Sequence, residues 1–528
     1  MTTQSGSLKQ LCIALTLFVM AFSGVRAQTK VFKAVAQDME QEFEPILQDG
    51  KLVGYLMFTQ LEKASADSFN YKLAIMDENL NDIGTVNFRE EKLNLKAVAF
   101  EQDVICLAYV QSNFVGKEFR NAKDFRKQTD EAKTALFTQF IGLDGKIVGT
   151  GKVKMDVKPE SQGVYYSNRK VVGNGHLKHG IQLKNMAGKG FACFYGDDTK
   201  NNLVIFNTAG KLTWQKQIGE DATDFTMLTS GAEVNLLVKL KDDMKEGGFE
   251  VLSYNPTDGT VYPKFLLKDK KGNALKPLTF DNDPVSGKPF VSGMVIDPVH
   301  GNDYATGKDL RHGPYSGMFS IGLNGHTKKD IQAAFSYWGD GSQSFIDKHG
   351  YYVEAGVYAN VEHSFRDYQG NTYFAAAAIK RKVAVGAIVG TVLTIPFLYP
   401  PFLFAATGYA RYSTGDVMLI KQDASGKLSM VNSIPAARSA NAFPRVALSA
   451  YGPGYYTVSN SDTRSEYLVV NDQKNINIYN INQKKVARTI PHKEGNSMVN
   501  VFPAKEGYIM VFEIDPKDRS TRLSIESL

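Results

Sequence analysis

The chain has 528 residues, 43% hydrophobic and 22% charged, and this composition predicts that most of it folds into a globular structure. Its formal net charge is +6, and no basic block is dense enough to predict nucleic acid as a partner. Aromatic residues, chiefly 32 Phe and 25 Tyr, favour strands because the pleated surface of a sheet accepts flat rings well.

The N-terminal segment, residues 1–27, has the pattern of a secretory signal peptide. Lys9 supplies the positive charge, "LCIALTLFVMAF" (11–22) the apolar region, and "VRA" (25–27) a small-residue cleavage site before Gln28. A retained membrane anchor is the alternative, but the apolar region is short for a span. We therefore expect export to the periplasm, or to the outer membrane or cell surface.

Two segments have a helical pattern. Residues 28–50 are expected to form a partly helical lead-in, with "KAVAQDMEQEFEPIL" (33–47) as its helix, before a repeat domain over 51–528. The charged stretch "VGKEFRNAKDFRKQTDEAKTA" (115–135) is interpreted as a solvated insertion between strands.

The exported chain would keep two cysteines, Cys106 and Cys193. Each lies in an apolar, strand-like run, "VICLAYV" (104–110) and "GFACFYG" (190–196). Two buried thiols are the preferred interpretation, and a disulfide in an oxidising compartment is the alternative. No cofactor is predicted.

Internal repetition is the most informative pattern in the sequence. One phrase recurs: an apolar strand, a short turn with Gly and Lys or Thr, and a second, alternating strand. Asp-Gly and Asn-Gly favour the positive φ angles of tight hairpin turns. The copies are "FIGLDGKIVGTGKV" (140–153), "VIFNTAGKLTWQKQI" (204–218), "VLSYNPTDGTVYPKFLL" (251–267), "MFSIGLNGHTKKDI" (318–331), "VMLIKQDASGKLSMVNSI" (417–434), and the degenerate "LAIMDENLNDIGTVNF" (73–88) and "INIYNINQKKVARTI" (476–490).

A further apolar strand precedes the hairpins, so each unit has about four strands, as in a propeller blade. The seven hairpins predict an all-β, β-propeller-like fold of about seven blades. "GYIMVFEIDPKDRSTRLSIE" (507–526) would be an eighth blade or a closing strand pair. Packed sandwiches are the rival fold, because strand spacing separates the two poorly.

The hairpin turns carry a "D-x-x-G-K" pattern, in full at Asp423–Lys427 and in the shortened form D-G-K at Asp144–Lys146. Together with the signal peptide, this pattern resembles secreted, propeller-like proteins of Gram-negative bacteria, many of unknown function. The resemblance spans about residues 50–520. It implies the fold, and it carries over no catalytic residue.

An uncharged run, Val383 to Ala410, interrupts the sixth unit. Pro396, Pro400 and Pro401 break it, and the piece before Pro396 would span roughly 20 Å as a helix, too short to cross a membrane. Strands are expected on both sides of the run, so we predict an apolar insertion, 383–410, that leaves the sheet and returns to the same side. A single transmembrane helix is the rejected alternative.

Cations flank this insertion at both ends, as suits contact with lipid phosphates. The alternatives are contact with a partner protein or coverage of the protein's own surface. The residues expected to contact a membrane or partner are Lys380, Arg381, Lys382, Pro396, Phe397, Tyr399, Phe402, Phe404 and Arg411.

Two further groups are weak candidates for binding sites. Residues 281–317 form a Gly- and Pro-rich loop whose carboxylates and imidazoles could meet around a metal, although a solvated loop is the simpler interpretation. Tyr337 and Trp338 could stack on a sugar, or be half-buried structural rings. The metal candidates are Asp297, His300, Asp303, Asp309 and His312.

The first hypothesis is an exported, non-catalytic propeller that serves as a binding or scaffold protein of the cell envelope, its partner a protein, a glycan or a lipid surface. The alternative is a propeller enzyme, a hydrolase or lyase acting on glycans. The sequence contains no Walker loop, nucleophile elbow or zinc-protease motif, and its catalytic residues are unknown. Carboxylates or imidazoles meeting in one pocket would favour the enzyme.

Overall fold

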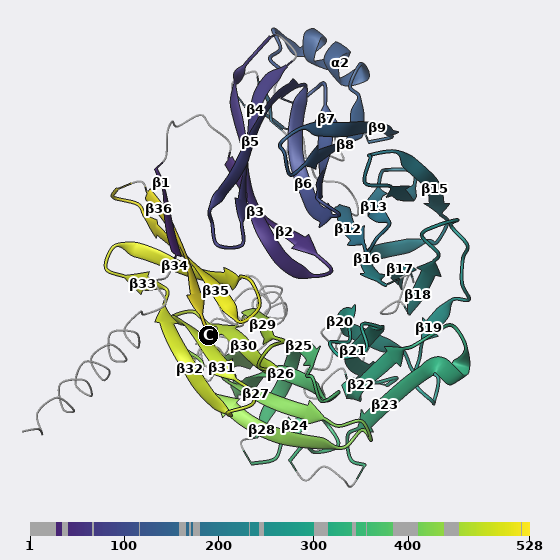
Figure 1. Cartoon of the computed structure of the whole chain (residues 1–528). Helices are drawn as coiled ribbons and strands as arrows, with labels where there is room; N and C mark the ends of the chain where they lie inside the picture. The colour runs from purple at the N-terminus through teal and green to yellow at the C-terminus, as the bar shows by residue number, and fades with distance from the viewer. Residues whose placement is uncertain are drawn as a thin grey trace, which may run out of the picture.

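The repeated strands assemble into a ring of sheets in the computed structural model of the chain (Figure 1). The structure describes residues 28–33, 41–65, 68–115, 117–157, 165–167, 170–172, 180–231, 233–241, 248–299, 315–340, 345–354, 356–383, 410–437, 454–518 and 520–528. The predicted signal peptide and nearly all of the apolar insertion lie outside the described residues.

The first four blades are antiparallel sheets of four consecutive strands. Blade 1 holds β2 (Gln41–Gln48), β3 (Lys51–Lys63), β4 (Phe69–Asp77) and β5 (Asp82–Glu90). Blade 2 holds β6 (Lys92–Glu101), β7 (Val104–Ser112), β8 (Thr134–Gly142) and β9 (Ile147–Met155). Blade 3 holds β12 (Ile181–Met186), β13 (Gly190–Gly196), β14 (Asn201–Phe206) and β15 (Leu212–Ile218), and blade 4 holds β16 (Ala222–Ser230), β17 (Glu233–Leu240), β18 (Phe249–Tyr254) and β19 (Phe265–Leu267).

The other four blades continue the ring. Blade 5 holds β20 (Leu275–Asn282), β21 (Pro289–Ile296), β22 (Tyr315–Leu323) and β23 (Ile331–Tyr337). Blade 6 holds β25 (Val357–Arg366), β26 (Thr372–Val383), β27 (Ala410–Gln422) and β28 (Leu428–Ile434), with β24 (Tyr351–Tyr352) beside β25. Blade 7 holds β29 (Gly454–Asn460), β30 (Ser465–Asn471), β31 (Asn475–Asn480) and β32 (Lys485–Pro491). Blade 8 holds β34 (Ser497–Pro503), β35 (Tyr508–Asp515), β36 (Ser520–Ser527) and, from the other end of the chain, β1 (Gln28–Lys33), with β33 (Lys493–Glu494) beside β34.

The described residues therefore form an eight-bladed β-propeller, with a small extra ribbon of β10 (Tyr165–Ser167) and β11 (Lys170–Val172) between blades 2 and 3. The all-β propeller prediction is confirmed, and the blade number is the higher of the two expected. All seven predicted hairpins are present. The candidate eighth hairpin, 507–526, supplies β35 and β36 of the closing blade.

Each of eight hydrophobic cores lies between two neighbouring blades. Strand β7 shows why: Ile105, Leu107 and Tyr109 face the core shared with blade 1, while Cys106 and Ala108 face the core shared with blade 3. Because side chains alternate along a strand, a strand between two cores is apolar on both faces. This explains the continuous apolar runs of the sequence. Cys106 and Cys193 are free, buried thiols of the core between blades 2 and 3, as preferred above.

Aspartates close many of the hairpin turns. In the turn after β25, Asp367 Oδ1 accepts hydrogen bonds from the backbone of Gln369 and Asn371, and Asn371 Nδ2 donates to the other carboxylate oxygen. Gly370 between them has φ +80°, which only glycine adopts without strain. The "D-x-x-G" pattern is thus a local structural device.

The ring has two different faces because its strands alternate in direction. Turns that join the first strand to the second, or the third to the fourth, lie on one face, here named the short-turn face. Connections from the second strand to the third, and from blade to blade, leave from the opposite, long-connection face. The apolar insertion (between β26 and β27), residues 297–314 of the Gly- and Pro-rich stretch (between β21 and β22) and helix α2 (Ala122–Asp130) all connect strand ends of this second face. The loop expected over 281–317 is wrong for residues 289–296, which form the buried strand β21.

The helix expected over 33–47 is wrong. Residues 41–48 form β2, which pairs with β3 from Gln41 opposite Thr59 to Gln48 opposite Lys51. Ile46 is 3% exposed in the core between blades 1 and 2, so tertiary packing overrides the local helical preference. Residues 28–33 belong to blade 8, so the predicted lead-in is part of the propeller. In the second helical segment, α2 is confirmed, and Asn121 Oδ1 caps it by accepting from the Asp124 backbone at 3.0 Å.

Candidate functional site

The predicted aromatic pair lies at the end of β23, where Tyr337 packs against the core between blades 4 and 5 and Trp338 packs against the core between blades 5 and 6. The Tyr337 hydroxyl donates to Asp269 Oδ2 at 2.9 Å, and Lys271 Nζ lies 4.4 Å from the centre of its ring. Burial, followed by the hydrogen bond to Asp269, raises the pKa of Tyr337 to about 12. Trp338 Nε1 donates to the Tyr315 carbonyl at 2.9 Å. Both rings thus have structural contacts, and their stacking on a sugar stays a prediction.

The predicted metal ligands are only partly described. Asp297 follows β21, and its Oδ1 accepts a hydrogen bond from the Val299 backbone at 2.7 Å. His300, Asp303, Asp309 and His312 lie outside the described residues. Within the described ranges, no group of three or more His, Cys, Asp or Glu side chains could hold a metal ion.

The two ends of the apolar insertion lie side by side. Val383 at the end of β26 pairs with Ala410 at the start of β27, and Lys382 lies opposite Arg411 in the same antiparallel register. The strands expected on both sides of the insertion are therefore confirmed as neighbours in one blade. Pro396, Phe397, Tyr399, Phe402 and Phe404 lie outside the described residues. Over the part of the chain that the structure describes, no helix is long and apolar enough to cross a membrane.

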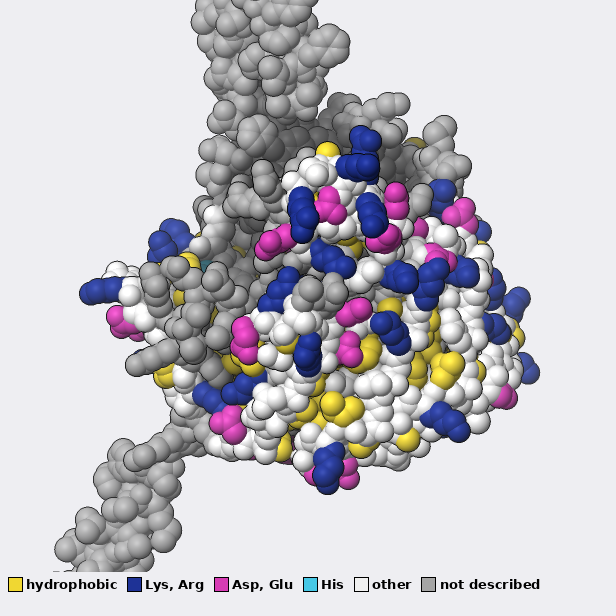
Figure 2. Space-filling model, turned by 90° about the horizontal axis from the view of Figure 1, so that it is seen from above, with side chains coloured by type: hydrophobic (Ala, Val, Ile, Leu, Met, Phe, Trp, Pro, Cys, Tyr) yellow, Lys and Arg dark blue, Asp and Glu magenta, His cyan; other side chains and the backbone are white. Residues whose placement is uncertain are grey.

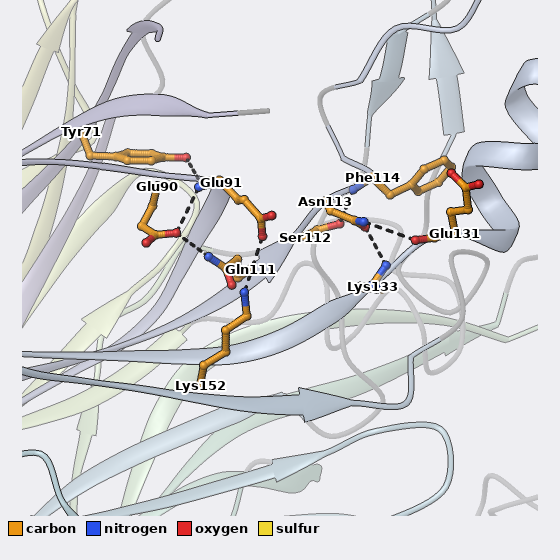
Figure 3. A network of polar contacts seen from close by, with 10 residues as sticks. All are labelled: Tyr71, Glu90, Glu91, Gln111, Ser112, Asn113, Phe114, Glu131, Lys133 and Lys152. Carbon is orange, nitrogen blue, oxygen red and sulfur yellow. Dashed lines mark hydrogen bonds and ion pairs between the residues drawn. The ribbon is translucent and has the colours of Figure 1, made fainter. Parts of the chain in front are cut away.

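A polar network anchors helix α2 to blade 2 (Figure 3). Asn113 Nδ2 donates to the Glu131 carbonyl at 3.3 Å, and Asn113 Oδ1 accepts from the Lys133 backbone at 2.6 Å. Nearby, Gln111 Nε2 donates to Glu90 Oε2 at 2.7 Å and so joins blade 2 to blade 1. These contacts hold the insertion in place and indicate a structural role.

The best candidate site that sequence reasoning missed is a cavity of about 380 Å³ between blades 4 and 5. It opens among the turns of the short-turn face. Its walls include Val251 and Phe265 of blade 4 and Leu323 and Ile331 of blade 5. This volume falls at the lower end of the size range of small-molecule sites. Such sites are typically apolar, with a few polar groups at defined positions.

Two polar side chains lie opposite each other on the blade 4 wall of this cavity. Asn235 of β17 pairs in register with Ser253 of β18, and the Ser253 hydroxyl donates to Asn235 Oδ1 at 2.6 Å. Asn235 is 1% exposed, and none of the described residues accepts a hydrogen bond from its Nδ2. A buried donor without an acceptor costs roughly 1–3 kcal/mol. This amide is the most notable polar group of the cavity.

A hydrogen bond between a histidine and a carboxylate joins the two blades at the same cavity. His326 Nε2 of blade 5 lies 2.9 Å from Glu233 Oε1 of blade 4, and the His326 ring stacks on Tyr262 with ring centres 3.9 Å apart. Lys264 forms ion pairs with Glu220 and, at 3.6 Å, with Glu250. The hydrogen bond to Glu220 is the main reason that the pKa of Lys264 is raised. The charges around the cavity are therefore largely paired within the chain.

The comparisons with known proteins do not identify an activity. A family model described as "Family of unknown function (DUF6770)" matches residues 8–120, about a fifth of the chain. No curated protein matches the chain.

Solved structures that resemble the chain include the Dos1 propeller, with 7% identity, 94% of each chain covered and a TM-score of 0.40. A europium-containing methanol dehydrogenase has 9% identity and a TM-score of 0.38, over 95% of this chain and 93% of that one. The β-propeller domain of the trilobed protease of Pyrococcus furiosus has 8% identity and a TM-score of 0.30, over 87% and 99%. At such scores, the likenesses carry no argument about ligands or chemistry.

Proposed function

We propose that this protein is an exported, non-catalytic binding or scaffold protein of the bacterial cell envelope, held on a lipid surface by the apolar insertion 383–410. The observation that carries this proposal is the pairing of Val383 with Ala410. Because both ends of the insertion leave one blade at adjacent positions, the segment can reach a surface without dividing the propeller between two compartments.

The charges at the base of the insertion support contact with an anionic surface. Lys380, Arg381 and Lys382 close β26, and Lys382 and Arg411 occupy opposite positions in the register. Like charges at opposite positions of neighbouring strands are unfavourable on their own. Lipid phosphates would offset this repulsion, with about 1 kcal/mol for each Lys or Arg near the membrane surface.

The cavity between blades 4 and 5 bears on the alternative of a glycan-cleaving enzyme. It brings one carboxylate and one imidazole together, as the alternative requires. However, Glu233 and His326 bond to each other, and the imidazole is stacked on Tyr262. Glu233 is the only carboxylate among the described residues that line the cavity, whereas most glycoside hydrolases use two, and this supports binding rather than turnover of a glycan.

Replacement of residues 384–409 by a short Gly-Ser link tests the lipid contact. Since β26 and β27 remain neighbours, the circular dichroism spectrum and thermal unfolding should not change, because shortening a loop costs little closure entropy. The wild-type protein should float with vesicles that contain anionic lipid, and the trimmed protein should stay at the bottom of the gradient. Vesicles of neutral phosphatidylcholine are the lipid control, and a variant with Lys380, Arg381, Lys382 and Arg411 replaced by Ser isolates the charge contribution.

Two outcomes would overturn the lipid contact. Unchanged flotation of a folded, trimmed protein would show that the insertion does not bind lipid. Collapse of the fold on trimming would show that the insertion is part of the core.

Export predicts an N-terminus at or near Gln28. Strand β1 begins at that residue, so cleavage after Ala27 would preserve all six β1–β36 pairs, from Gln28–Ile525 to Lys33–Ser520. N-terminal sequencing of protein recovered from the cell envelope should therefore begin at Gln28. Envelope protein that still begins at Met1 or Thr2 would contradict the signal peptide.

A further inference from the structure

We propose that the cavity between blades 4 and 5 binds a single N-acetylated sugar ring and recognises it through the acetamido group. This inference is independent of lipid attachment, because the cavity lies on the short-turn face and the insertion leaves from the opposite one. The argument starts from the unpartnered amide of Asn235.

The Asn235 amide requires a hydrogen-bond acceptor from the ligand. Its Oδ1 accepts a hydrogen bond from the Ser253 hydroxyl. Its Nδ2 is buried at the cavity wall and meets no acceptor among the described residues. A ligand carbonyl placed there would satisfy the donor, and a ligand without an acceptor would leave it unpaired.

A matching acceptor lies two positions along the same strand. Glu233 and Asn235 share one face of β17, because side chains alternate, and their backbones are about 7 Å apart. The Glu233 carboxylate bonds His326 through Oε1 and retains acceptor capacity, because a carboxylate has about four lone-pair sites. In a trans secondary amide, C=O and N–H point in opposite directions. Such a group can accept from Asn235 and donate to Glu233 at the same time.

Charge and size narrow the ligand further. Glu233 bonds His326, and Lys264 pairs with Glu220 and Glu250. Lys328 also lines the cavity and has no ion pair among the described residues, but it is exposed to solvent, so the buried part of the cavity favours an uncharged ligand over an ion. A volume of about 380 Å³ suits one sugar ring better than an extended chain. Val251 and Phe265 provide apolar surface for the acetyl methyl group and for the ring faces. A neutral, compact molecule with one secondary amide fits these limits.

The test measures binding of methyl glycosides of N-acetylglucosamine and N-acetylgalactosamine by saturation-transfer NMR and calorimetry. The full-length protein should bind at least one of the two, and glucose and galactose should bind ~10-fold more weakly, because they leave Asn235 Nδ2 unpaired. Asn235→Ala should weaken binding of the N-acetylated sugar by a similar factor. Asn202→Ala is the matched control, since Asn202 is 4% exposed in blade 3 and lies outside the cavity.

Several results would overturn the proposal. These are no binding of either N-acetylated sugar, equal binding of glucose, or equal losses in the Asn235 and Asn202 variants. Preference for an N-acetyl dipeptide over the sugars would also overturn it, in favour of a peptide ligand. Vesicle flotation of Asn235→Ala should match wild type, so failure of this site and failure of lipid attachment are distinguishable.

Discussion

At the scale of single residues, Glu466 is a buried carboxyl group in an unfavourable position. It is 2% exposed in β30, the second strand of blade 7, and accepts a hydrogen bond from the Ser459 hydroxyl at 2.7 Å. Burial, assisted by the nearby Asp367 and Glu506 carboxylates, raises the pKa of Glu466 to about 7, and the Ser459 bond only partly opposes this. Glu466 therefore holds its proton in the folded protein at pH values at which the unfolded chain has lost it.

This raised pKa makes stability depend on pH. Below pH 4.5 the group is protonated in both states; between about 4.5 and 7 only the unfolded state ionises, so the free energy of unfolding falls as pH rises. The difference amounts to at most about 3 kcal/mol. Glu466→Gln, which keeps the shape without the charge, should match wild type near pH 4 and be more stable at pH 8. Urea unfolding at the two pH values measures this, and a constant difference between the two proteins would contradict it.

The candidate site shows which residues a sequence can and cannot identify. A turn aspartate such as Asp367 bonds residues two and four positions away, so its role is visible in the local pattern. Glu233 and His326 are 93 residues apart and meet only because blade 5 packs on blade 4. The sole local sign of the cavity was a polar Asn235 inside an apolar strand run, and many buried strand asparagines have ordinary structural partners.

At the scale of elements, strands between two cores were the most predictable parts. Strand β7 is buried along almost its whole length, and its sequence is a continuous apolar run between turn residues. Strand β2 was the least predictable. It is an inner strand with the burial pattern of a half-exposed element, and its charged residues gave it a helical periodicity. Its identity depends on pairing with β3 and on contact with blade 2, neither of which its own sequence encodes.

At the scale of the whole molecule, the outer surface is consistent with a protein that does not aggregate through its sheets. Figure 2 shows Lys and Arg interspersed with Asp and Glu over the described surface on one side, with hydrophobic side chains between them. The fourth strands of the blades are the exposed ones, such as β32, which alternates little and is almost entirely exposed. Because the blades form a closed ring, no blade stands at the end of a row with one side uncovered.

Blade 8, which closes the ring, is built from both ends of the described chain. Counting hairpins in the sequence therefore could not decide between seven and eight blades. Strand β1 provides the fourth strand of blade 8, nearly 500 residues from its partner β36. Lys505 of blade 8 bonds Asn79 of blade 1 at 2.5 Å, and Lys51 pairs with Glu506 at 2.7 Å. A separate hydrophobic core fills the same junction.

Removal of residues 28–33 should therefore destabilise the whole propeller. The truncated protein loses six antiparallel pairs, each worth roughly 0.2–1 kcal/mol, and the contact of Lys30 with the Leu80 carbonyl of blade 1 at 3.3 Å. It also exposes the edge of β36, which can pair with another molecule. Thermal unfolding should shift to lower temperature by a few degrees, about 1–6 kcal/mol in free energy, and light scattering should show concentration-dependent association. A protein that begins at Gln28 is the control and should be monomeric and stable.

The synthetic peptide QTKVFK, added in excess, should restore part of the lost stability by occupying the vacated edge. A truncated protein that unfolds at the same temperature as the control would show that β1 does not hold the ring closed.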